Sequence, residues 1–138
     1  LNTVIPALNC MEKQGSGQIA IMSSLASFKG FSGAPSYIAT KAAVRIWGEG
    51  LRERYKEKGV KVSVICPGFV KSRITEKNLF WMPLLMSSEK AAKIICRGLH
   101  KNYPRIAFPR RMYFIALAFS LLPTFLANLL TTKIPQKE

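Results

Sequence analysis

The stretch SYIATKAAV, residues 36–44, places Tyr37 four residues ahead of Lys41. Residues four apart on a helix lie on one face, one turn apart, so a phenol and an ammonium group would be neighbours here. A phenol is a poor base at neutral pH because its unperturbed pKa is about 10, and a nearby positive charge favours the phenolate. The pair is therefore suited to proton transfer, although many ordinary helices carry the same spacing.

A serine pair closes a short apolar run ahead of this tyrosine. Residues 19–24, IAIMSS, predict a strand buried on both faces, and the loop that follows contains two glycines and a proline. A hydroxyl group at Ser24 could hydrogen-bond a substrate oxygen beside Tyr37. The ordinary alternative is a serine that starts a turn.

A second predicted strand ends in residues that change how closely other groups can approach. Residues 60–66, VKVSVIC, are rich in β-branched side chains and are followed by Pro67 and Gly68. Proline carries no N–H group, and glycine has no side chain to exclude a ligand or another backbone segment. We therefore expect this strand end to border the same site as Ser24 and Tyr37.

The remaining elements are predicted from apolar periodicity and turn residues. Helices are expected at residues 3–13, 36–58 and 87–102, and strands at 19–24, 60–66 and 105–108. Ser87 is suited to cap the third helix, and Gly59 is suited to end the second. Strands that alternate with helices predict an α/β fold with a parallel sheet covered on both faces. Such a sheet binds ligands outside the carboxyl ends of its strands, here after Ser24, Cys66 and Phe108.

Charge and cysteine content narrow the class of protein. The net charge is +14, from 21 basic and 7 acidic residues, which fits a solvated surface or attraction to an anionic membrane. No nucleic-acid-reading motif accompanies the dispersed basic residues, so we expect no nucleic acid partner. Cys10, Cys66 and Cys96 are odd in number and widely spaced, beside a single histidine, which indicates neither a metal site nor a disulfide framework. Cys66 is expected to be a buried free thiol in a reducing, cytoplasmic compartment.

Three motifs together resemble one known family. They are GxIAIMSS at 17–24, YIATKAA at 37–43 and GVKVSVICPGFVKS at 59–72, with the family's spacing between the serine and the tyrosine. Over residues 1–108 the chain resembles the short-chain dehydrogenase/reductases. The resemblance implies a Rossmann-like, doubly wound parallel sheet. It also implies an NAD(P)-dependent oxidoreductase that moves a hydride between the nicotinamide and an alcohol or ketone.

The same resemblance implies a role for each matching residue. Tyr37 would be the general acid/base, Lys41 would assist it and bind the ribose hydroxyls, and Ser24 would orient the substrate oxygen. The residues implied to contact the nicotinamide end of the cofactor are Pro67, Gly68, Val70 and Ser72. Ser72 stands where the family usually has threonine, and it keeps the hydroxyl group that could contact the carboxamide.

Parts of the family's pattern are missing from the sequence. No glycine-rich phosphate loop follows a strand, and neither the residue that selects NAD or NADP nor the family's catalytic asparagine is identified. We therefore interpret residues 1–109 as the C-terminal part of a catalytic domain whose N-terminal βαβ half is absent. The 138-residue chain alone is expected neither to turn over nor to hold the cofactor tightly, and the whole protein is expected to be a homo-oligomer.

Two apolar segments bear on the substrate. Residues 73–86 occupy the family's variable substrate loop and could cover an apolar substrate, or pack on the core or on a partner subunit. Residues 110–138 form a hydrophobic tail, whose stretch 112–130 is uncharged and approaches the length of a membrane-spanning helix. The alternatives are a span, an in-plane interfacial helix, and a helical cover on the substrate pocket and dimer interface, with surface association favoured over a span.

These features lead to two functional hypotheses. The first is a membrane-associated oxidoreductase that acts on a hydrophobic or lipid alcohol or ketone. The second is a catalytically incomplete member of the fold that serves as a membrane-associated binding or scaffold protein. The first hypothesis requires the side chains of Ser24, Tyr37 and Lys41 to converge at one edge of the sheet.

Overall fold

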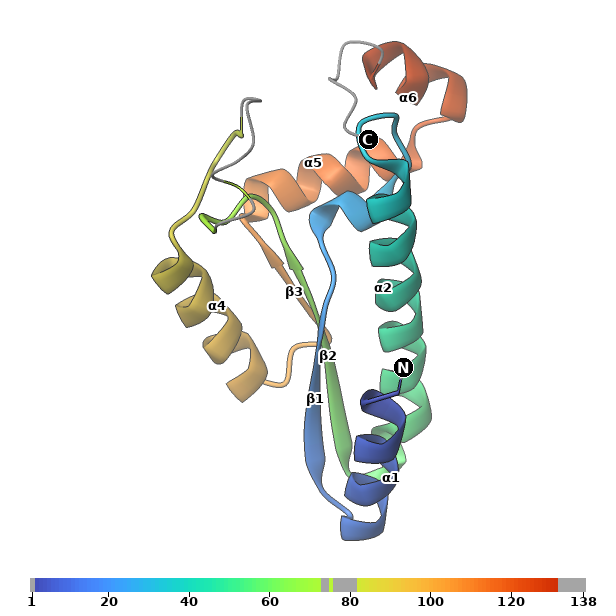
Figure 1. Ribbon diagram of the computed structural model, residues 1–138, viewed down its shortest axis with the longest axis vertical. Coiled ribbons are helices and arrows are strands. Elements are labelled where there is room, and N and C mark those ends of the chain that lie inside the picture. Colours follow the sequence, from blue (N-terminus) through green and yellow to red (C-terminus); the bar gives the residue numbers. More distant parts are fainter. Residues whose placement is uncertain (1, 73–74, 76–81, 132–138) are drawn as a thin grey trace.

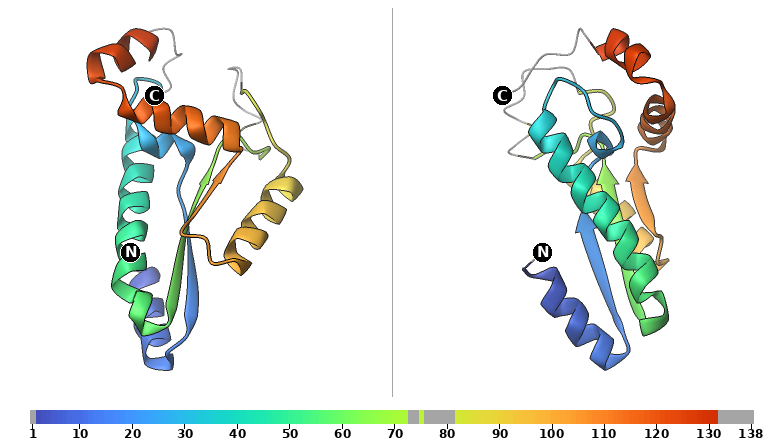
Figure 2. Two further views of the ribbon diagram at one scale, coloured as in Figure 1. Left: turned by 180° about the vertical axis from the view of Figure 1, so that it is seen from behind. Right: turned by 90° about the vertical axis from the view of Figure 1, so that its right-hand side faces the viewer.

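The chain folds into a parallel sheet with helices on both faces (Figure 1; Figure 2). The computed structural model describes residues 2–72, 75 and 82–131. Within these residues the strands are β1 (Gly17–Met22), β2 (Val60–Pro67) and β3 (Arg105–Phe108), paired in the order β1-β2-β3. The helices are α1 (Val4–Gln14), α2 (Pro35–Tyr55), α4 (Ser88–His100), α5 (Arg110–Leu121) and α6 (Thr124–Thr131), with short 3₁₀ helices η1 (Leu25–Phe28) and η2 (Lys56–Lys58). The predicted α/β class with a parallel sheet is confirmed.

Each face of the sheet has its own hydrophobic core. The core under α1 and α2 contains the buried residues Leu8, Ile21, Leu51, Tyr55, Val60 and Val62. Gly48 allows α2 to approach the sheet, because a Cβ atom at this position would lie only 2.7 Å from the Val64 side chain. The core under α4, on the opposite face, contains Ile65, Ala91, Ile106 and Phe108.

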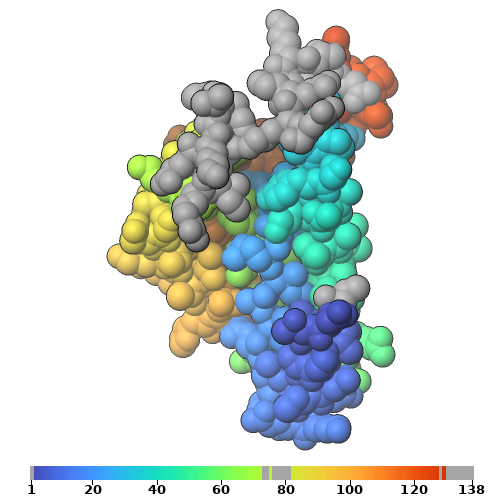
Figure 3. All heavy atoms as spheres, in the orientation of Figure 1, coloured from blue at the N-terminus to red at the C-terminus, as the bar shows by residue number. Residues whose placement is uncertain are grey.

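The two longer strands differ in burial. In the central strand β2 only Lys61 is exposed, and even the side chain of Ser63 is fully buried. In β1 the side chains of Gln18, Ala20 and Met22 are exposed, so the expectation that this strand is buried on both faces is wrong. Within the described residues β1 is an edge strand, and α1 and α2 cover one of its faces. The space-filling view shows atoms of β1 at the surface between α2 and α4 (Figure 3).

Helix ends follow the predicted local signals. α2 begins with Pro35 and continues through η2 to Gly59, whose φ of 72° lies in the left-handed region. A Cβ atom at Gly59 would also collide with the carbonyl group of Gly15, where α1 ends, so a larger residue does not fit this turn. The Ser87 hydroxyl accepts a hydrogen bond of 3.3 Å from the Lys90 amide and caps α4, as predicted.

The apolar tail forms two short helices where one hydrophobic helix was expected. α5 and α6 are separate because Pro123 holds the preceding Leu122 in an extended conformation, with ψ of 139°. The Lys29 ammonium group donates a hydrogen bond of 2.8 Å to the Leu122 carbonyl at this break. Among the described residues, none of the helices has the length and apolar character needed to cross a membrane.

The end of the sheet formed by the strands' carboxyl termini is covered by α5. This helix lies across the top of the sheet in Figure 1 and contacts η1 and β3. Nearby, Val70 forms an isolated parallel bridge with Met86. Most of the predicted substrate loop between them, residues 73–74 and 76–81, lies outside the described residues.

Candidate active site

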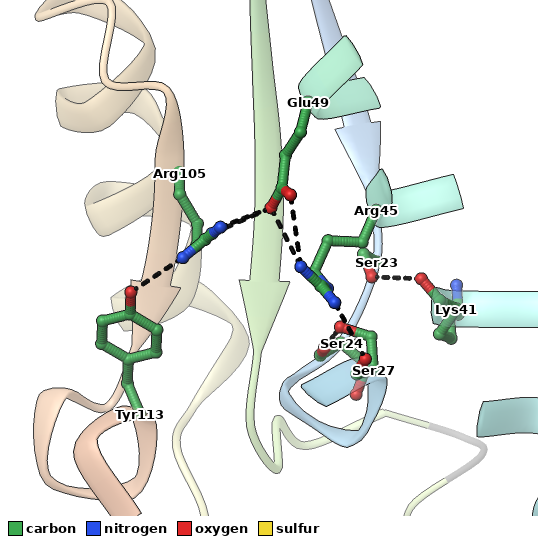
Figure 4. A network of polar contacts seen from close by, with 8 residues as sticks. All are labelled: Ser23, Ser24, Ser27, Lys41, Arg45, Glu49, Arg105 and Tyr113. Atoms are coloured by element: carbon green, nitrogen blue, oxygen red, sulfur yellow. Dashed lines mark hydrogen bonds and ion pairs between the residues drawn. The ribbon is translucent and has the colours of Figure 1, made fainter. Parts of the chain in front are cut away.

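Three segments meet at the carboxyl edge of the sheet, namely the end of β1, the first half of α2 and the end of β2. The Lys41 ammonium group donates a hydrogen bond of 3.2 Å to the carbonyl of Met22, the last residue of β1. In return, the Ser23 hydroxyl donates a hydrogen bond of 2.8 Å to the Lys41 carbonyl (Figure 4). These two contacts fix the start of α2 beside the end of β1, because each element supplies both a donor and an acceptor.

Tyr37 and Lys41 are neighbours on α2, as their spacing predicts. The Lys41 Nζ atom lies 5.7 Å from the centroid of the Tyr37 ring. The tyrosine side chain is half exposed, at 49%, so its hydroxyl group can reach a bound substrate. An ammonium group has three N–H donors, and the contact with Met22 engages one of them. The pair therefore offers an accessible phenol and additional donors beside it.

Ser24 lies between β1 and η1, and its backbone and side chain both organise the turn. Its hydroxyl oxygen accepts a hydrogen bond of 3.1 Å from the Ala26 amide and caps η1. The same hydroxyl group is 3.5 Å from the Pro67 carbonyl at the end of β2, a long and therefore weak donor contact. The hydroxyl position is thus set by the turn, while its proton is held loosely enough to be donated to a substrate oxygen.

Gly68 packs against the start of α5, the helix that covers this end of the sheet. Its amide donates a hydrogen bond of 2.7 Å to the Phe108 carbonyl, which joins the ends of β2 and β3. A Cβ atom at Gly68 would lie 2.8 Å from Met112 Sδ and 3.1 Å from Pro109 Cδ. The space that glycine leaves here is therefore occupied by side chains of Pro109 and Met112 from the segment that begins α5, whereas the sequence had suggested a ligand or another backbone.

The two remaining predicted residues make contacts away from Ser24 and Tyr37. Val70 packs against the core under α4. Ser72 is exposed, and its amide donates a hydrogen bond of 2.7 Å to the Thr75 hydroxyl. The described contacts thus bring Ser24 to Pro67 and Tyr37 to Lys41, whereas Val70 and Ser72 lie on the segment that follows.

The short chain dehydrogenase family has a sequence model that matches residues 1–82, which include every predicted site residue. The chain belongs to this family of oxidoreductases. Similar curated proteins include uncharacterized oxidoreductases of Myxococcus xanthus, 37% identical over 79% of this chain, and of Mycobacterium tuberculosis, 33% identical over 75% of it. The chain spans 42% and 41% of the length of these two relatives.

Solved structures of short chain dehydrogenases share the fold. One described as a short chain dehydrogenase/reductase family protein is 27% identical with a TM-score of 0.63, over 75% of this chain and 47% of that chain. A short-chain dehydrogenase from Sphingobium yanoikuyae in complex with NADPH is 20% identical with a TM-score of 0.70, over 95% of this chain and 51% of that chain. The Rossmann-like arrangement implied by the resemblance is therefore confirmed for the described residues.

A second polar cluster in this short chain dehydrogenase was not predicted. The Glu49 carboxylate lies between two guanidinium groups, from Arg45 on α2 and from Arg105 on β3 (Figure 4). Partial burial opposes the charge on Arg105, but hydrogen bonds with Tyr113 and Glu49 outweigh it and raise the pKa of this guanidinium. A sequence signal existed, because Tyr37, Lys41, Arg45 and Glu49 follow one another at four-residue intervals along α2.

Cys66 is a buried free thiol, as predicted. It lies in β2 immediately before Pro67, and burial raises the pKa of its thiol to about 11. Cys10 and Cys96 are free and exposed. Because the thiolate is the reactive form of cysteine, Cys66 contributes packing to the sheet edge and no nucleophile.

Proposed function

We propose that the whole protein is an NAD(P)-dependent oxidoreductase that transfers a hydride between the nicotinamide and an alcohol or ketone. The observation that carries the proposal is the position of Lys41. Its ammonium group donates a hydrogen bond to the carbonyl of Met22, the last residue of β1, and lies beside the Tyr37 ring. Met22 immediately precedes the Ser23–Ser24 pair. Family membership and the location at the carboxyl edge of a parallel sheet support the same assignment.

The proposed chemistry divides between two hydroxyl groups and one ammonium group. When a ketone is reduced, the Tyr37 hydroxyl donates its proton to the carbonyl oxygen, and in the reverse direction the phenolate accepts it. The Ser24 hydroxyl donates a hydrogen bond to the same oxygen and stabilises the negative charge that develops there. The Lys41 ammonium group stabilises the phenolate that remains after the proton has left.

The residues present fit the end of a nicotinamide cofactor that carries the ribose. Hydroxyl groups of a sugar need hydrogen-bond donors, and the Lys41 ammonium group has donors beyond the one that Met22 engages. Pro67, which accepts from Ser24, adds a rigid apolar surface at the same edge. When bound, the nicotinamide supplies or accepts the hydride. NADP and NAD are both proposed as cofactors, and the NADPH bound by one structural neighbour makes NADPH the first to test.

The proposed substrate is hydrophobic, with lipid ketones and alcohols as the leading class. In the described part of the substrate loop, Leu84 and Leu85 are 47% and 39% exposed. α5 adds apolar side chains above the same edge, including Met112, which packs beside Gly68. An apolar lining with a few placed polar groups is the usual composition of a pocket for such ligands.

We also propose that α5 and α6 rest on the surface of an anionic membrane. The large apolar side chains exposed on these helices are Phe114, Ile115, Leu121, Phe125, Leu126 and Leu129. Arg110 and Arg111 are exposed at the start of α5, and the whole chain is strongly basic. Apolar side chains that enter the interface, together with basic residues that attract anionic lipid, are the combination that holds interfacial helices on bilayers.

Vesicle flotation tests this surface. The whole protein is expected to float with phosphatidylserine-containing vesicles, and exchange of both Phe114 and Ile115 for serine is expected to reduce the floating fraction severalfold. Flotation that is absent, with light scattering that shows self-association through the same two residues, would assign this apolar surface to a subunit interface.

A hydride-transfer assay tests the proposed activity. The whole protein is given NADPH or NADH with aliphatic ketones of increasing chain length, and loss of the reduced nicotinamide is followed by absorbance. Ser24→Ala is expected to lower kcat about 100-fold, since it removes a donor to the developing oxyanion, whereas Ser32→Ala in the exposed loop is expected to leave kcat unchanged. Cofactor binding without turnover of any ketone or alcohol would favour the binding or scaffold function.

A further inference from the structure

One carboxylate joins two arginines from elements far apart in the sequence. Arg45 Nη1 lies 3.2 Å from both carboxylate oxygens of Glu49. Arg105 donates to the Glu49 Oε1 atom through Nε at 3.1 Å and through Nη2 at 2.6 Å. Without Glu49, the two guanidinium groups would face each other with no intervening negative charge.

Both arginines then contact the η1 turn. Their guanidinium groups lie over the ring of Phe28, at 4.7 Å for Arg45 and 5.3 Å for Arg105. Arg45 Nη2 also donates a long and therefore weaker hydrogen bond of 3.4 Å to the Ser27 carbonyl. Phe28 and Ser27 are the last two residues of η1, so the cluster holds this turn from the side of α2 and β3.

The held turn carries the candidate catalytic hydroxyl. The Ser27 hydroxyl and the Ser27 amide both donate to the Ser24 carbonyl, at 2.6 Å and 3.1 Å. The Ser24 side chain in turn accepts the Ala26 amide, as described above. Any shift of Ser27 therefore moves Ser24, whose hydroxyl would face the substrate.

The cover helix is attached to the same cluster. Arg105 Nη1 donates a hydrogen bond of 3.1 Å to the Tyr113 hydroxyl on α5. The Tyr113 ring packs edge-on against Phe28, with ring centroids 5.7 Å apart. One carboxylate on α2 thus sets the positions of the serine turn and of the helix above it.

We propose that Glu49, acting through Arg45, positions the Ser24 hydroxyl for the reaction. The inference rests on the proposed oxidoreductase function, and it makes Glu49 and Arg45 positioning residues that do not touch the substrate. Tyr37 and Lys41 lie on the first turns of the same helix, so one helix carries the proposed proton donor and also contacts the turn that bears Ser24.

Stability and turn geometry are two separate readouts of this cluster. The side chains of Glu49, Arg45 and Arg105 are 33%, 16% and 30% exposed, so the ion pairs are mostly shielded from water and loss of the Glu49 charge is expected to lower the melting temperature. Lower stability alone would leave the turn of the folded molecule in place. Loss of the Arg45 contacts with Phe28 and Ser27 would loosen that turn in the folded molecule.

Hydrogen exchange of the whole protein tests the positioning without reference to activity. Glu49→Gln keeps the size of the side chain and removes its charge. Exchange is expected to quicken in peptides that cover residues 24–30, which include the Ser27 amide, with little change elsewhere. Glu53→Gln, the same substitution one turn farther along α2 at an exposed position, is the matched control. It is expected to leave hydrogen exchange in residues 24–30 unchanged.

A double-mutant cycle tests the connection to Ser24. Glu49→Gln alone is expected to lower kcat about tenfold, because small displacements of a reacting group are costly, while the dissociation constant of NADPH stays the same. In the Ser24→Ala background the Glu49→Gln substitution is expected to change kcat less than about twofold, since its effect passes through the serine hydroxyl. General structural damage would lower kcat equally in both backgrounds.

The outcomes separate the two claims. Unchanged exchange in residues 24–30, or an effect of Glu49→Gln that is equally large in the Ser24→Ala background, would overturn the positioning role. Faster exchange in that segment in a whole protein with no oxidoreductase activity would support the positioning of the turn and contradict the proposed function.

Discussion

Helices α2 and α5 both border the carboxyl edge of the sheet, but they are held in different ways. On α2 the side chains of Lys41, Arg45 and Glu49 have defined polar partners, and Ile38, Gly48 and Leu51 are buried. α5 has no buried residue, and Phe114 and Ile115 are 63% and 67% exposed. α2 is therefore held firmly on the sheet and carries the residues proposed for proton transfer, whereas α5 is a cover whose apolar surface faces outward.

The cause of the difference lies in the sequence of each helix. α2 has a glycine at the point where it crosses the sheet, so it packs directly on β2. α5 is apolar around most of its circumference, so burial of one side leaves large apolar side chains on the other. Substitutions at the buried and polar-contact positions of α2 should therefore damage activity or stability, and substitutions on the outer side of α5 should do neither.

The largest expected effect belongs to the site end of α2. Lys41→Met removes the ammonium group that stabilises the phenolate and bonds Met22, and we expect kcat of the whole protein to fall about 1000-fold. The measurement is steady-state reduction of the best ketone with saturating NADPH. Lys56→Met, an exposed change on η2, is the control and should keep the wild-type rate. A loss of less than about tenfold for Lys41→Met would remove this residue from the reaction.

Stability should separate the inner side of α2 from the outer side of α5. Leu51 is 6% exposed in the core under α1 and α2, so Leu51→Ala is expected to lower the free energy of unfolding by about 3 kcal/mol. Leu121 is 85% exposed, and Leu121→Ala is expected to stay within about 0.5 kcal/mol of wild type. Urea unfolding of the whole protein measures both. Equal destabilisation by the two changes would mean that α5 is packed as firmly as α2.

The sheet beneath α2 should also lose stability at alkaline pH through Cys66 of β2. Below pH 9.0 the thiol is protonated in both the folded and the unfolded state, and its contribution to stability is fully present. Between 9.0 and about 11 the unfolded state loses the proton while the folded state keeps it, so the free energy of unfolding falls as pH rises. The loss from this group is at most about 3 kcal/mol.

The comparison of wild type with Cys66→Ala isolates the contribution of the Cys66 thiol to the free energy of unfolding. The stability difference between the two proteins should shrink as the pH is raised from 9 to 11, because only wild type carries the buried thiol. Urea unfolding at several pH values is the measurement. A difference that is constant over this range would show that the thiol ionises as easily in the folded state as in the unfolded one.

Local signals in the sequence were sufficient for most of the helices and strands. The β-branched run of β2, the glycine after η2 and the Ser87 cap each act within a few residues, and all three occur as predicted. The burial of β1 and the path of the tail were not predictable in this way. The first depends on which helices cover the strand. The break at Pro123 is a local signal, but the position of the tail against Lys29, 93 residues away, is not.

The candidate site likewise contains residues that local sequence patterns predict and residues that only long-range contacts bring together. Tyr37 and Lys41 follow from helical spacing, and Ser24 from its place at a strand end, with the family resemblance joining them. The ion pair of Glu49 with Arg105 spans 56 residues, so no local pattern could pair these two. The four-residue interval that continues from Lys41 to Arg45 and Glu49 was visible in the sequence, but a charged helix face usually indicates solvent exposure.

The most direct test of the proposed proton transfer is the loss of the Tyr37 hydroxyl in the whole protein. Tyr37→Phe keeps the ring and its contact with Lys41, and Tyr103→Phe, at a similarly exposed position after α4, is the matched control. Single-turnover reduction of the best ketone with NADPH is predicted to slow about 1000-fold for Tyr37→Phe, with NADPH affinity unchanged, and to keep its wild-type rate for Tyr103→Phe. Equal rates for wild type and Tyr37→Phe would contradict the assignment of proton transfer to α2.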